Sequence, residues 1–496
     1  MLFTTAIFVF LFLPITFAGF FAIASRSHRS AAAWLFLCSL VFYGYWMPEF
    51  VTLLLASICG NYLVGNRIGT STSAGRRDSA RRWLIVGVAA NLAVLGYFKY
   101  SGFLLANINQ LAGLGLDIGH VILPIGISFY TFTQIAFLAD TYQKGVREYK
   151  FVHYGLFVTY FPHLIAGPVL HHAQMMPQFG EAKTYRLDWA NVTGGLAIFA
   201  VGLFKKVVLA DGLSPYADAI FGPADQGLWP TYTEAWLGAL AYTLQLYFDF
   251  SGYSDMAVGL SWIFNVRLPF NFNSPYKAVN IIEFWRRWHI TLSNFLRDYL
   301  YIPLGGNRLG RFRRHLNLLV TMLLGGLWHG ASWTFVAWGG LHGAYLMINH
   351  GYRALVAPTV QKRLDESRLG TVVAWSVTTL AVIVAWVFFR ASTFEGAARV
   401  LSGLVFLGHE PEGVANPLLW NAGLHAGTGF AWCVPLLIVA ALAPNSNQIG
   451  TWALLLSRSR ENARALMAGA ACTTIALLVL LNSARDTVSA FIYFNF

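Results

Sequence analysis

Charged residues are scarce in this sequence. Asp, Glu, Lys and Arg together make up 11% of the 496 residues, whereas hydrophobic residues make up 56%. So few charged side chains cannot cover the surface of a soluble globule of this length. The composition therefore excludes an ordinary soluble protein and indicates one that is embedded in a membrane.

Cysteine is also scarce, and the familiar nucleotide and hydrolase motifs are missing. The four cysteines form no CxxC pair and have no spacing suited to zinc, so we expect small buried residues and no metal site. They are Cys38, Cys59, Cys433 and Cys472. No GxxxxGK[ST], GxSxG, HExxH or dinucleotide-binding glycine pattern occurs. Soluble-type nucleotide or hydrolase chemistry is therefore unsupported, and we predict no bound cofactor.

Apolar runs recur along the whole chain, many of them close to the roughly 20 residues that a membrane-crossing helix needs. We predict an all-α polytopic membrane protein with about ten to twelve tilted transmembrane helices, together with short re-entrant or interfacial helices. No fixed-period repeat and no long linker divides the sequence. Residues 1–496 are therefore expected to form a single integral-membrane domain.

The formal charge of +12 is concentrated in short loops beside apolar runs, such as 67–82, 353–368 and 458–464. Basic loops of this kind face the cytoplasm, so the charge indicates membrane orientation and not nucleic-acid binding. The connection 390–428 carries Glu410 and Glu412 and suits an outside loop. This arrangement predicts that both termini face outward.

The central stretch, residues 271–349, differs from the other apolar segments. Its second part, Leu316 to Asn349, contains no Asp, Glu, Lys or Arg, yet it holds His329 and His342. An ionisable side chain inside a membrane segment is costly, so His329 is a functional candidate. The neighbouring glycines, Gly330 among them, allow a helix break or close helix contact. In an unbroken helix His342 would lie on the opposite face, which makes it the weaker candidate.

The first part of the central stretch predicts an amphipathic helix over Ile281 to Leu300. At 100° per residue Trp285 and Trp288 share one face, while Arg286 and Arg287 lie on the other. Such a helix should lie along the membrane interface or line a wet cavity. His289 falls on the border between the faces, so it can point into a cavity while it stays hydrated.

A concentrated positive field surrounds this helix, with eight Lys or Arg against two Asp or Glu between residues 277 and 314. The field is consistent with a cytoplasmic anchoring collar. It is equally consistent with a cavity mouth that attracts an anionic donor, such as the phosphates of coenzyme A. Both roles can hold at once.

Other polar residues in apolar surroundings leave alternatives open. Asp249 and Asp255 are either substrate contacts or structural caps. A cluster of histidines follows no metal-binding spacing and is expected to be solvated or interfacial. Its members are His153, His163, His171 and His172.

Several motifs together resemble the membrane-bound O-acyltransferase family, in particular its bacterial branch that acetylates alginate. They are EFWRRWHITLS (283–293), RDYLYIPLGGNR (297–308), TMLLGGLWHGASWTF (321–335), NFNSPY (271–276), YFDFSGYSDMAVG (247–259), FPHLIAGPV (161–169) and the tail FIYFNF (491–496). The resemblance extends over nearly the whole chain. It implies a bundle of tilted helices around a central cavity that narrows at the membrane midplane.

The resemblance also implies catalytic roles for His329 and His289. Further residues of these motifs are candidate contacts for the donor or the acceptor: Trp285, Arg286, Arg287, Asp298, Asn307, Trp328, Ser332, Tyr253 and Asp255. His329 could act as a general base or as a transient acyl carrier, and the sequence leaves both open.

By the same resemblance, the chain would sit in a bacterial inner membrane and take an acetyl group from a cytoplasmic thioester, acetyl-coenzyme A. The group would pass to a periplasmic SGNH-like acetyltransferase or directly to an exported polysaccharide. Alginate is the first expectation, with peptidoglycan, cellulose and teichoic acid as alternatives. A transporter or channel is the alternative of another class, although the sequence has no matching interrupted segments in its two halves.

Overall fold

The computed structural model describes residues 1–119, 121–148, 150–405, 415–485 and 491–492. In these ranges all regular structure is helical and no strand occurs, which confirms the all-α prediction. The chain forms two compact units, which are described separately. Unit 1 comprises 1–204, 253–270 and 446–495, and unit 2 comprises 205–252 and 271–445. Glu410, Glu412 and residues 493–496 of the FIYFNF tail lie outside the described residues.

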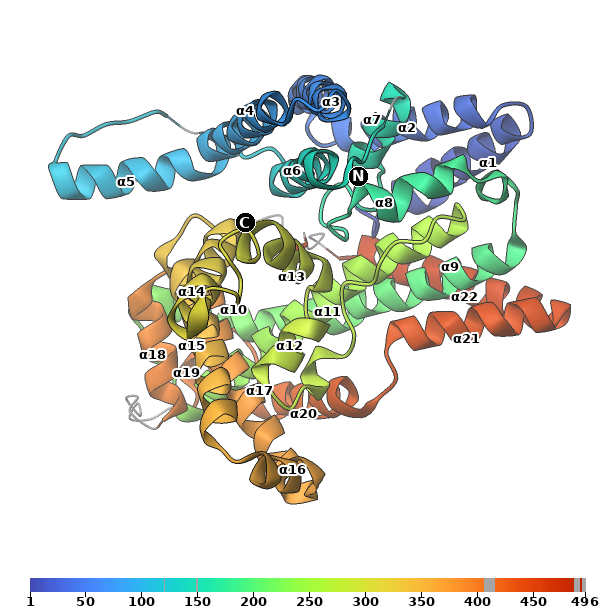
Figure 1. The fold of residues 1–496 in the computed structure, drawn as a ribbon. Helices are drawn as coiled ribbons and strands as arrows, with labels where there is room; N and C mark the ends of the chain where they lie inside the picture. The colour runs from blue at the N-terminus through green and yellow to red at the C-terminus, as the bar shows by residue number, and fades with distance from the viewer. Residues whose placement is uncertain (120, 149, 406–414, 486–490, 493–496) are drawn as a thin grey trace. The chain divides into compact units, whose positions relative to one another are not determined.

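Unit 1 contains the α-helices of the first 204 residues and two α-helices from residues 446–495 (Figure 1). They are α1 (Leu13–Ala24), α2 (His28–Gly44), α3 (Val51–Ser73), α4 (Arg77–Leu95), α5 (Ser101–Ala112), α6 (Ile127–Lys144), α7 (Phe151–Thr159), α8 (His172–Met175), α9 (Trp189–Phe204), α21 (Ser446–Ser459) and α22 (Glu461–Ser483). The long helix α11 (Tyr232–Ile263) contributes its last part to unit 1 and its first part to unit 2.

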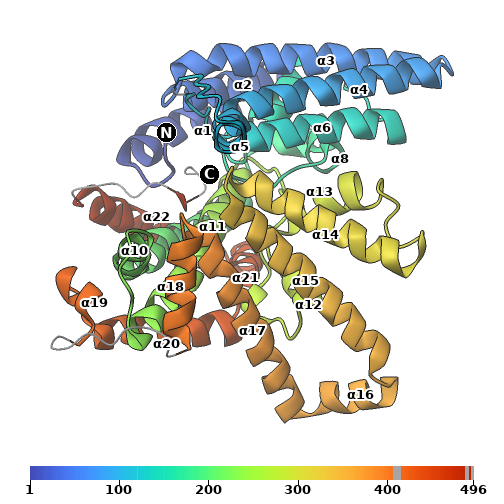
Figure 2. The ribbon, with the colours of Figure 1, turned by 90° about the vertical axis from the view of Figure 1, so that its left-hand side faces the viewer.

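Helices α3 and α4 lie side by side in unit 1 (Figure 2). A buried amide pair joins them, because Asn91 donates to the Oδ1 of Asn61 at 2.6 Å and Asn61 donates back at 3.2 Å. In an apolar environment an amide needs such a partner, since no water replaces a lost hydrogen bond. The reciprocal pair therefore fixes the register of the two helices.

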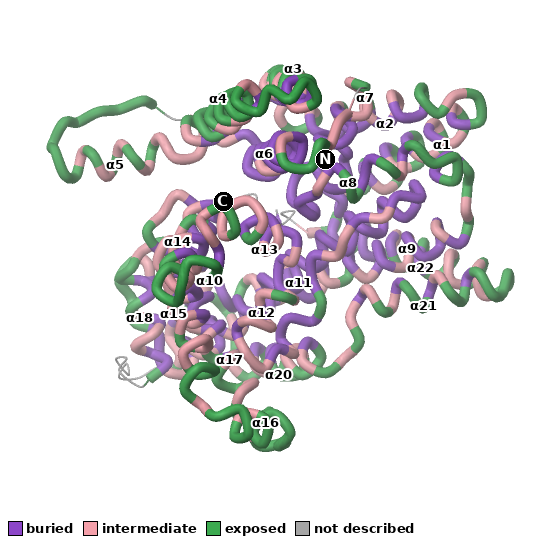
Figure 3. Tube along the Cα trace, in the orientation of Figure 1, coloured by how far each residue is buried: buried purple, intermediate pink, exposed green. Residues whose placement is uncertain are grey.

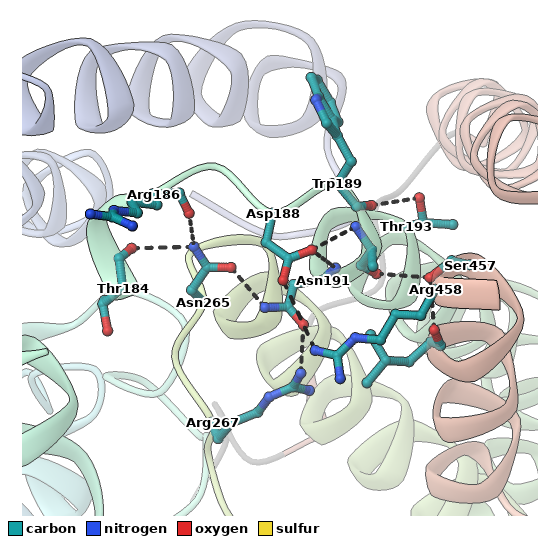
Figure 4. A network of polar contacts seen from close by, with 12 residues as sticks. Thr184, Arg186, Asp188, Trp189, Asn191, Thr193, Asn265, Arg267, Ser457 and Arg458 are labelled. Atoms are coloured by element: carbon teal, nitrogen blue, oxygen red, sulfur yellow. Dashed lines mark hydrogen bonds and ion pairs between the residues drawn. The ribbon is translucent and has the colours of Figure 1, made fainter. Parts of the chain in front are cut away.

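A polar network fastens the start of α9 in unit 1 (Figure 4). Asp188 accepts from the N–H groups of Ala190 and Asn191 at 2.9 and 3.2 Å and so acts as the cap of α9. Asn191 donates to Asn265, whose left-handed backbone has a φ of 59°. Arg267 donates to the Oδ1 of Asn191 at 2.7 Å. The network ties the loop after α11 to the first turn of α9.

Unit 2 contains one helix before the central stretch, the helices of that stretch, and those that follow it up to residue 445. They are α10 (Asp211–Asp225), α12 (Ile281–Arg287), α13 (Ile290–Leu296), α14 (Gly310–His329), α15 (Trp333–Leu355), α16 (Pro358–Glu366), α17 (Arg368–Arg390), α18 (Phe394–Leu404), α19 (Pro417–Asn421) and α20 (Ala426–Leu442). The first part of α11 is buried, whereas α16 is largely exposed (Figure 3).

Helices α14 and α15 pack closely along a seam of glycines (Figure 2). A Cβ at Gly326 would lie 2.2 Å from the backbone oxygen of Phe335, and one at Gly339 would lie 2.2 Å from that of Met322. Only glycine permits backbones to approach this closely. The predicted close helix contact near His329 is therefore confirmed.

Five helical segments in the described residues are long and apolar enough to cross a membrane, or six if one bent pair counts as a span. The five are Pro48–Ser73, Arg77–Ala112, Trp189–Asp225, Arg368–Arg390 and Glu461–Ser483. This number is smaller than the predicted ten to twelve. Helix α14 illustrates the reason, because Arg311, Arg313 and Arg314 occupy its first turns while its second half is apolar.

The cysteines only partly follow the prediction of burial. Cys38 and Cys433 are buried, but Cys59 and Cys472 are exposed on the surfaces of α3 and α22. Those two helices belong to segments apolar enough to cross a membrane. An exposed thiol there can face lipid, where a small apolar side chain needs no protein cover.

Candidate functional site

His329 is the last residue of α14 and is 3% exposed. The helix ends there because Gly330 adopts an extended conformation, with φ −161° and ψ 149°. Ser332, a predicted substrate contact, accepts from the N–H of Thr334 at 3.3 Å and caps the start of α15. The break between α14 and α15 thus places an imidazole at a buried helix end.

Aromatic rings enclose His329 within unit 2. Its ring centroid lies 5.0 Å from those of Trp328 and Trp338 and 5.2 Å from that of Phe389 on α17. We call these three side chains the His329 cage. An apolar cage strengthens the electrostatic interactions of a polar group inside it and excludes water.

His289 lies in the backbone break between α12 and α13, not on a continuous helix. Its φ of 41° is left-handed, and its side chain is 0% exposed. The prediction of one amphipathic helix from Ile281 to Leu300, with a hydrated His289 on its border, is therefore wrong. A helical-wheel argument assumes an unbroken helix, and the break turns His289 into the interior.

The two predicted catalytic residues come together. The ring of His289 lies 6.4 Å from that of His329, 6.2 Å from that of Trp328 and 4.7 Å from that of Phe250. Both imidazoles are buried in unit 2, 0% and 3% exposed. The paired histidines within aromatic walls suit transfer of a proton in a dry site.

His342 also belongs to this cluster, contrary to the sequence argument. Trp338 lies between the two imidazoles, 5.0 Å from His329 and 4.8 Å from His342, ring to ring. The expectation that His342 faces away is wrong, since the chain is broken at Gly330 and α15 packs back against α14. The sequence also gave no reason to single out Trp338, because it is one of 17 tryptophans.

The predicted contacts on α12 have separate environments. Trp285 donates from Nε1 to the Nδ1 of His342 at 3.3 Å and so joins the cluster. Arg287 forms an ion pair with Glu283 at 2.7 Å. Arg286 is exposed. Of these three, Trp285 is the one that contacts the histidine cluster, whereas Arg286 is available to an anionic group outside it.

Each of the remaining predicted contacts has its own environment. Asp298 forms an ion pair with the adjacent Arg297 at 2.7 Å, and Asn307 is exposed in the turn before α14. Tyr253 and Asp255 belong to unit 1, where both are buried and Tyr253 stacks on Phe3 at 5.0 Å. Their functional roles stay predictions.

Asp249 contributes to a buried ion cluster in unit 2. The ammonium of Lys206 lies 2.6 Å from Asp249 and 2.8 Å from Asp211. Lys206 belongs to a π-helical turn, Lys205–Ala210, which interrupts the helical segment between α9 and α10. This contact favours the structural alternative for Asp249, because a buried carboxylate requires a cationic partner.

The four histidines expected to be solvated are more enclosed than predicted. His163 is buried, with Nε2 3.0 Å from the oxygen of Phe157, and His172 is buried with Nε2 3.2 Å from Glu148. His153 and His171 are half-buried. No group of three metal-ligating side chains occurs among the described residues.

Glu148 lies in the loop between α6 and α7, and its pKa is below its ordinary value. Burial alone would raise that pKa. Hydrogen bonds from His172 and from the backbone N–H of Lys150, together with the nearby charges of His153 and His172, outweigh burial. The cluster therefore favours an ionised carboxylate.

Comparison with known proteins gives a consistent result. The profile of the "MBOAT, membrane-bound O-acyltransferase family" matches residues 133–390. A peptidoglycan O-acetyltransferase of Helicobacter pylori is 39% identical over 100% of this chain and 98% of its own length. A probable alginate O-acetylase of Azotobacter vinelandii is 45% identical over 82% of this chain and 79% of its own. A teichoic acid D-alanyltransferase of Bacillus subtilis is 28% identical over 55% of this chain and 69% of its own.

Proposed function

Since this chain belongs to the membrane-bound O-acyltransferase family and is a membrane O-acyltransferase, we propose that it transfers acetyl groups to an exported polysaccharide. The donor in this proposal is acetyl-coenzyme A on the cytoplasmic side of a bacterial inner membrane. The observation that carries the proposal is the pair of buried histidines, His289 and His329, with ring centroids 6.4 Å apart. The family assignment supports an enzyme over the transporter alternative.

The proposed reaction is an acyl transfer from sulfur to oxygen. An imidazole of the pair takes the proton of the acceptor hydroxyl as its oxygen attacks the thioester carbonyl carbon. The carbon–sulfur bond then breaks, and the imidazolium returns the proton to the leaving thiolate. If His329 is instead a transient acyl carrier, the acetyl group passes through its ring nitrogen before it reaches the hydroxyl.

The His329 cage supports this chemistry by keeping water away from the thioester. Trp328, Trp338 and Phe389 place aromatic carbon around the ring. Water would otherwise compete with the acceptor hydroxyl and hydrolyse the donor. The exposed Arg286 and the other basic residues of 277–314 would attract the donor phosphates.

Alginate is the first candidate acceptor, supported by 45% identity to the Azotobacter vinelandii alginate O-acetylase. Peptidoglycan is the second, because the Helicobacter pylori relative aligns over the full length of this chain. A periplasmic acetyltransferase of SGNH type is the proposed partner where transfer to the glycan is indirect. Proteoliposomes that hold acetyl-coenzyme A inside, with alginate oligomers or glycan strands outside, distinguish the acceptors by the product that gains acetate.

The first test of the proposal is His329→Ala. We expect at least about a hundredfold loss of acetyl transfer, since a positioned acid–base group contributes roughly 10²–10⁴-fold. The measurement is release of free coenzyme A together with acetate on the acceptor, in proteoliposomes. The matched control is His425→Ala, because His425 is exposed and precedes α20. Wild-type transfer by folded His329→Ala protein would remove the catalytic role.

A further inference from the structure

Asn271, the first residue of the NFNSPY motif, is 1% exposed and lies against the His289 break. Its side-chain oxygen, Oδ1, lies 3.3 Å from the backbone nitrogen of Thr291 and 2.7 Å from the Thr291 hydroxyl. The Nδ1 atom of His289 lies 3.2 Å from the same oxygen. Three polar groups of described residues therefore converge on one amide oxygen.

This convergence determines where the proton of His289 sits. A backbone N–H can only donate, so the Asn271 atom that it meets must be the amide oxygen and not the NH₂ group. An amide oxygen can only accept, so Nδ1 of His289 must carry a hydrogen. In a neutral imidazole the other nitrogen, Nε2, then holds the lone pair and points away from Asn271.

The backbone holds this geometry on both sides of His289. The backbone N–H of Asn273 donates to the backbone carbonyl oxygen of Arg287 at 2.9 Å. The backbone N–H of Ile290 donates to the backbone carbonyl oxygen of Asn271, also at 2.9 Å. The two bonds bracket the left-handed residue and hold the extended segment 271–273 against it. The side chain and the backbone of the same segment thus act together on His289.

We propose that Asn271 is a positioning residue for acyl transfer, which fixes the tautomer of His289 so that Nε2 serves as the proton acceptor. This inference rests on the proposed function. In the step concerned, Nε2 takes the hydroxyl proton, the acceptor oxygen bonds to the acyl carbon, and the carbon–sulfur bond breaks with its electron pair on sulfur. The proton then passes from Nε2 to the thiolate, which restores the neutral Nδ1–H ring. In a histidine base, a hydrogen bond from one ring nitrogen to an acceptor leaves the other ring nitrogen able to take a proton.

Activity is measured with the full-length chain in proteoliposomes, with acetyl-coenzyme A as donor and alginate oligomers as acceptor. Asn271→Leu keeps the bulk but removes the acceptor. We expect kcat to fall by at least about tenfold, which is less than the roughly 10²–10⁴-fold that a whole acid–base group contributes, because the imidazole itself remains. Thr291→Val is the matched control, since it removes one donor to Asn271 and leaves the His289 contact; we expect transfer within about threefold of wild type.

Asn271→Asp separates positioning from a purely structural role. The carboxylate still accepts from Nδ1–H and stabilises the imidazolium form, so we expect activity to recover at high pH with the acidic limb of the rate profile displaced to higher pH. Among the described rings that contact His289, the titratable one is His329. The pH profile of Asn271→Asp is therefore compared with that of His329→Gln. A structural role would instead lower thermal stability in both Asn271 variants and leave the pH profile in place.

The tautomer of His289 is measured independently of any activity assay, from the ¹⁵N chemical shifts of histidine-labelled protein. The His289→Ala variant assigns the signal. We expect a protonated Nδ1 in wild type and mixed tautomers in Asn271→Leu. A protonated Nε2 in wild type, or wild-type kcat in folded Asn271→Leu, would overturn the inference. If wild type shows the expected tautomer but transfers no acetyl group, the proposed function fails and the tautomer assignment stands.

Discussion

Three buried histidines in unit 2 are held by different kinds of contact. His289 donates from Nδ1 to an amide oxygen, whereas His342 accepts at Nδ1 from the indole N–H of Trp285. The two neutral rings therefore carry their protons on opposite nitrogens. The ring of His329 contacts the aromatic rings of its cage. The three histidines thus differ in their hydrogen-bonding roles, because their neighbours differ.

Lys206 provides a test of a buried ion cluster at the residue scale. Lys206→Met removes the cation that lies 2.6 Å from Asp249 and 2.8 Å from Asp211. Loss of one partner of a buried ion pair costs about 3–5 kcal/mol, so we expect a marked fall in the thermal unfolding temperature of detergent-purified protein.

The control for this substitution is Lys362→Met. Lys362 lies 3.8 Å from Glu366 on α16, and both side chains are well exposed. Exposed pairs of this kind contribute about 0–1 kcal/mol. Equal unfolding temperatures for the two variants would contradict a stabilising role of the Lys206 cluster.

At the scale of elements, two helix breaks build the candidate site. One separates α12 from α13 at His289, and the other separates α14 from α15 at Gly330. Each break places an imidazole in the interior of unit 2. Close packing of α14 on α15 then brings Trp338 to within 5.0 Å of His329, ring to ring.

The glycine seam between α14 and α15 gives a prediction for this packing. Gly339→Ala would place a Cβ 2.2 Å from the oxygen of Met322, so the helices must separate. Overpacking of this kind costs about 1–3 kcal/mol, and we expect both a lower unfolding temperature and reduced acetyl transfer.

The adjacent glycine supplies the control. A Cβ at Gly340 would lie 3.5 Å from Leu323 Cδ2, which is an ordinary contact. Gly340→Ala should therefore keep both stability and transfer close to wild type. Similar losses in both variants would show that the seam does not set the distance between His329 and Trp338.

At the scale of the whole molecule, two compact units share one chain and one long helix, α11. Polar clusters stabilise each unit internally, the Asp188 network in unit 1 and the Lys206 cluster in unit 2. The single domain expected from the lack of linkers stays a prediction. The inner-membrane location and the orientation of the termini in the membrane stay predictions too.

Membrane topology can be tested on either side of α17. The basic loop prediction places Lys362 inside, and one crossing by α17 then places Glu395 outside. In a variant with all four native cysteines replaced by Ala, we expect an impermeant maleimide to label Glu395→Cys in intact cells. Lys362→Cys should be labelled only after permeabilisation. Labelling of both positions from one side would contradict a span at α17, and the reversed pattern would invert the predicted orientation.

The sequence by itself determined the class of the protein and its main candidate. Scarce charge and long apolar runs require a membrane environment, and an imidazole in such a run marks His329, because these properties follow from solvation alone. The motifs around it also predicted the family. Gly330 and the glycines beside His329 likewise indicated a helix break or a close helix contact, but not the path of the chain after it.

Only the tertiary structure decided how the candidate residues meet. Helical periodicity cannot locate a left-handed residue, so it placed His289 at a wet border and His342 on a remote face. Backbone hydrogen bonds from the segment 271–273 create the His289 break, and the return of α15 onto α14 brings Trp338 between His329 and His342. The His289 break and the return of α15 onto α14 depend on contacts between residues that are distant in sequence. Local sequence patterns therefore do not predict them.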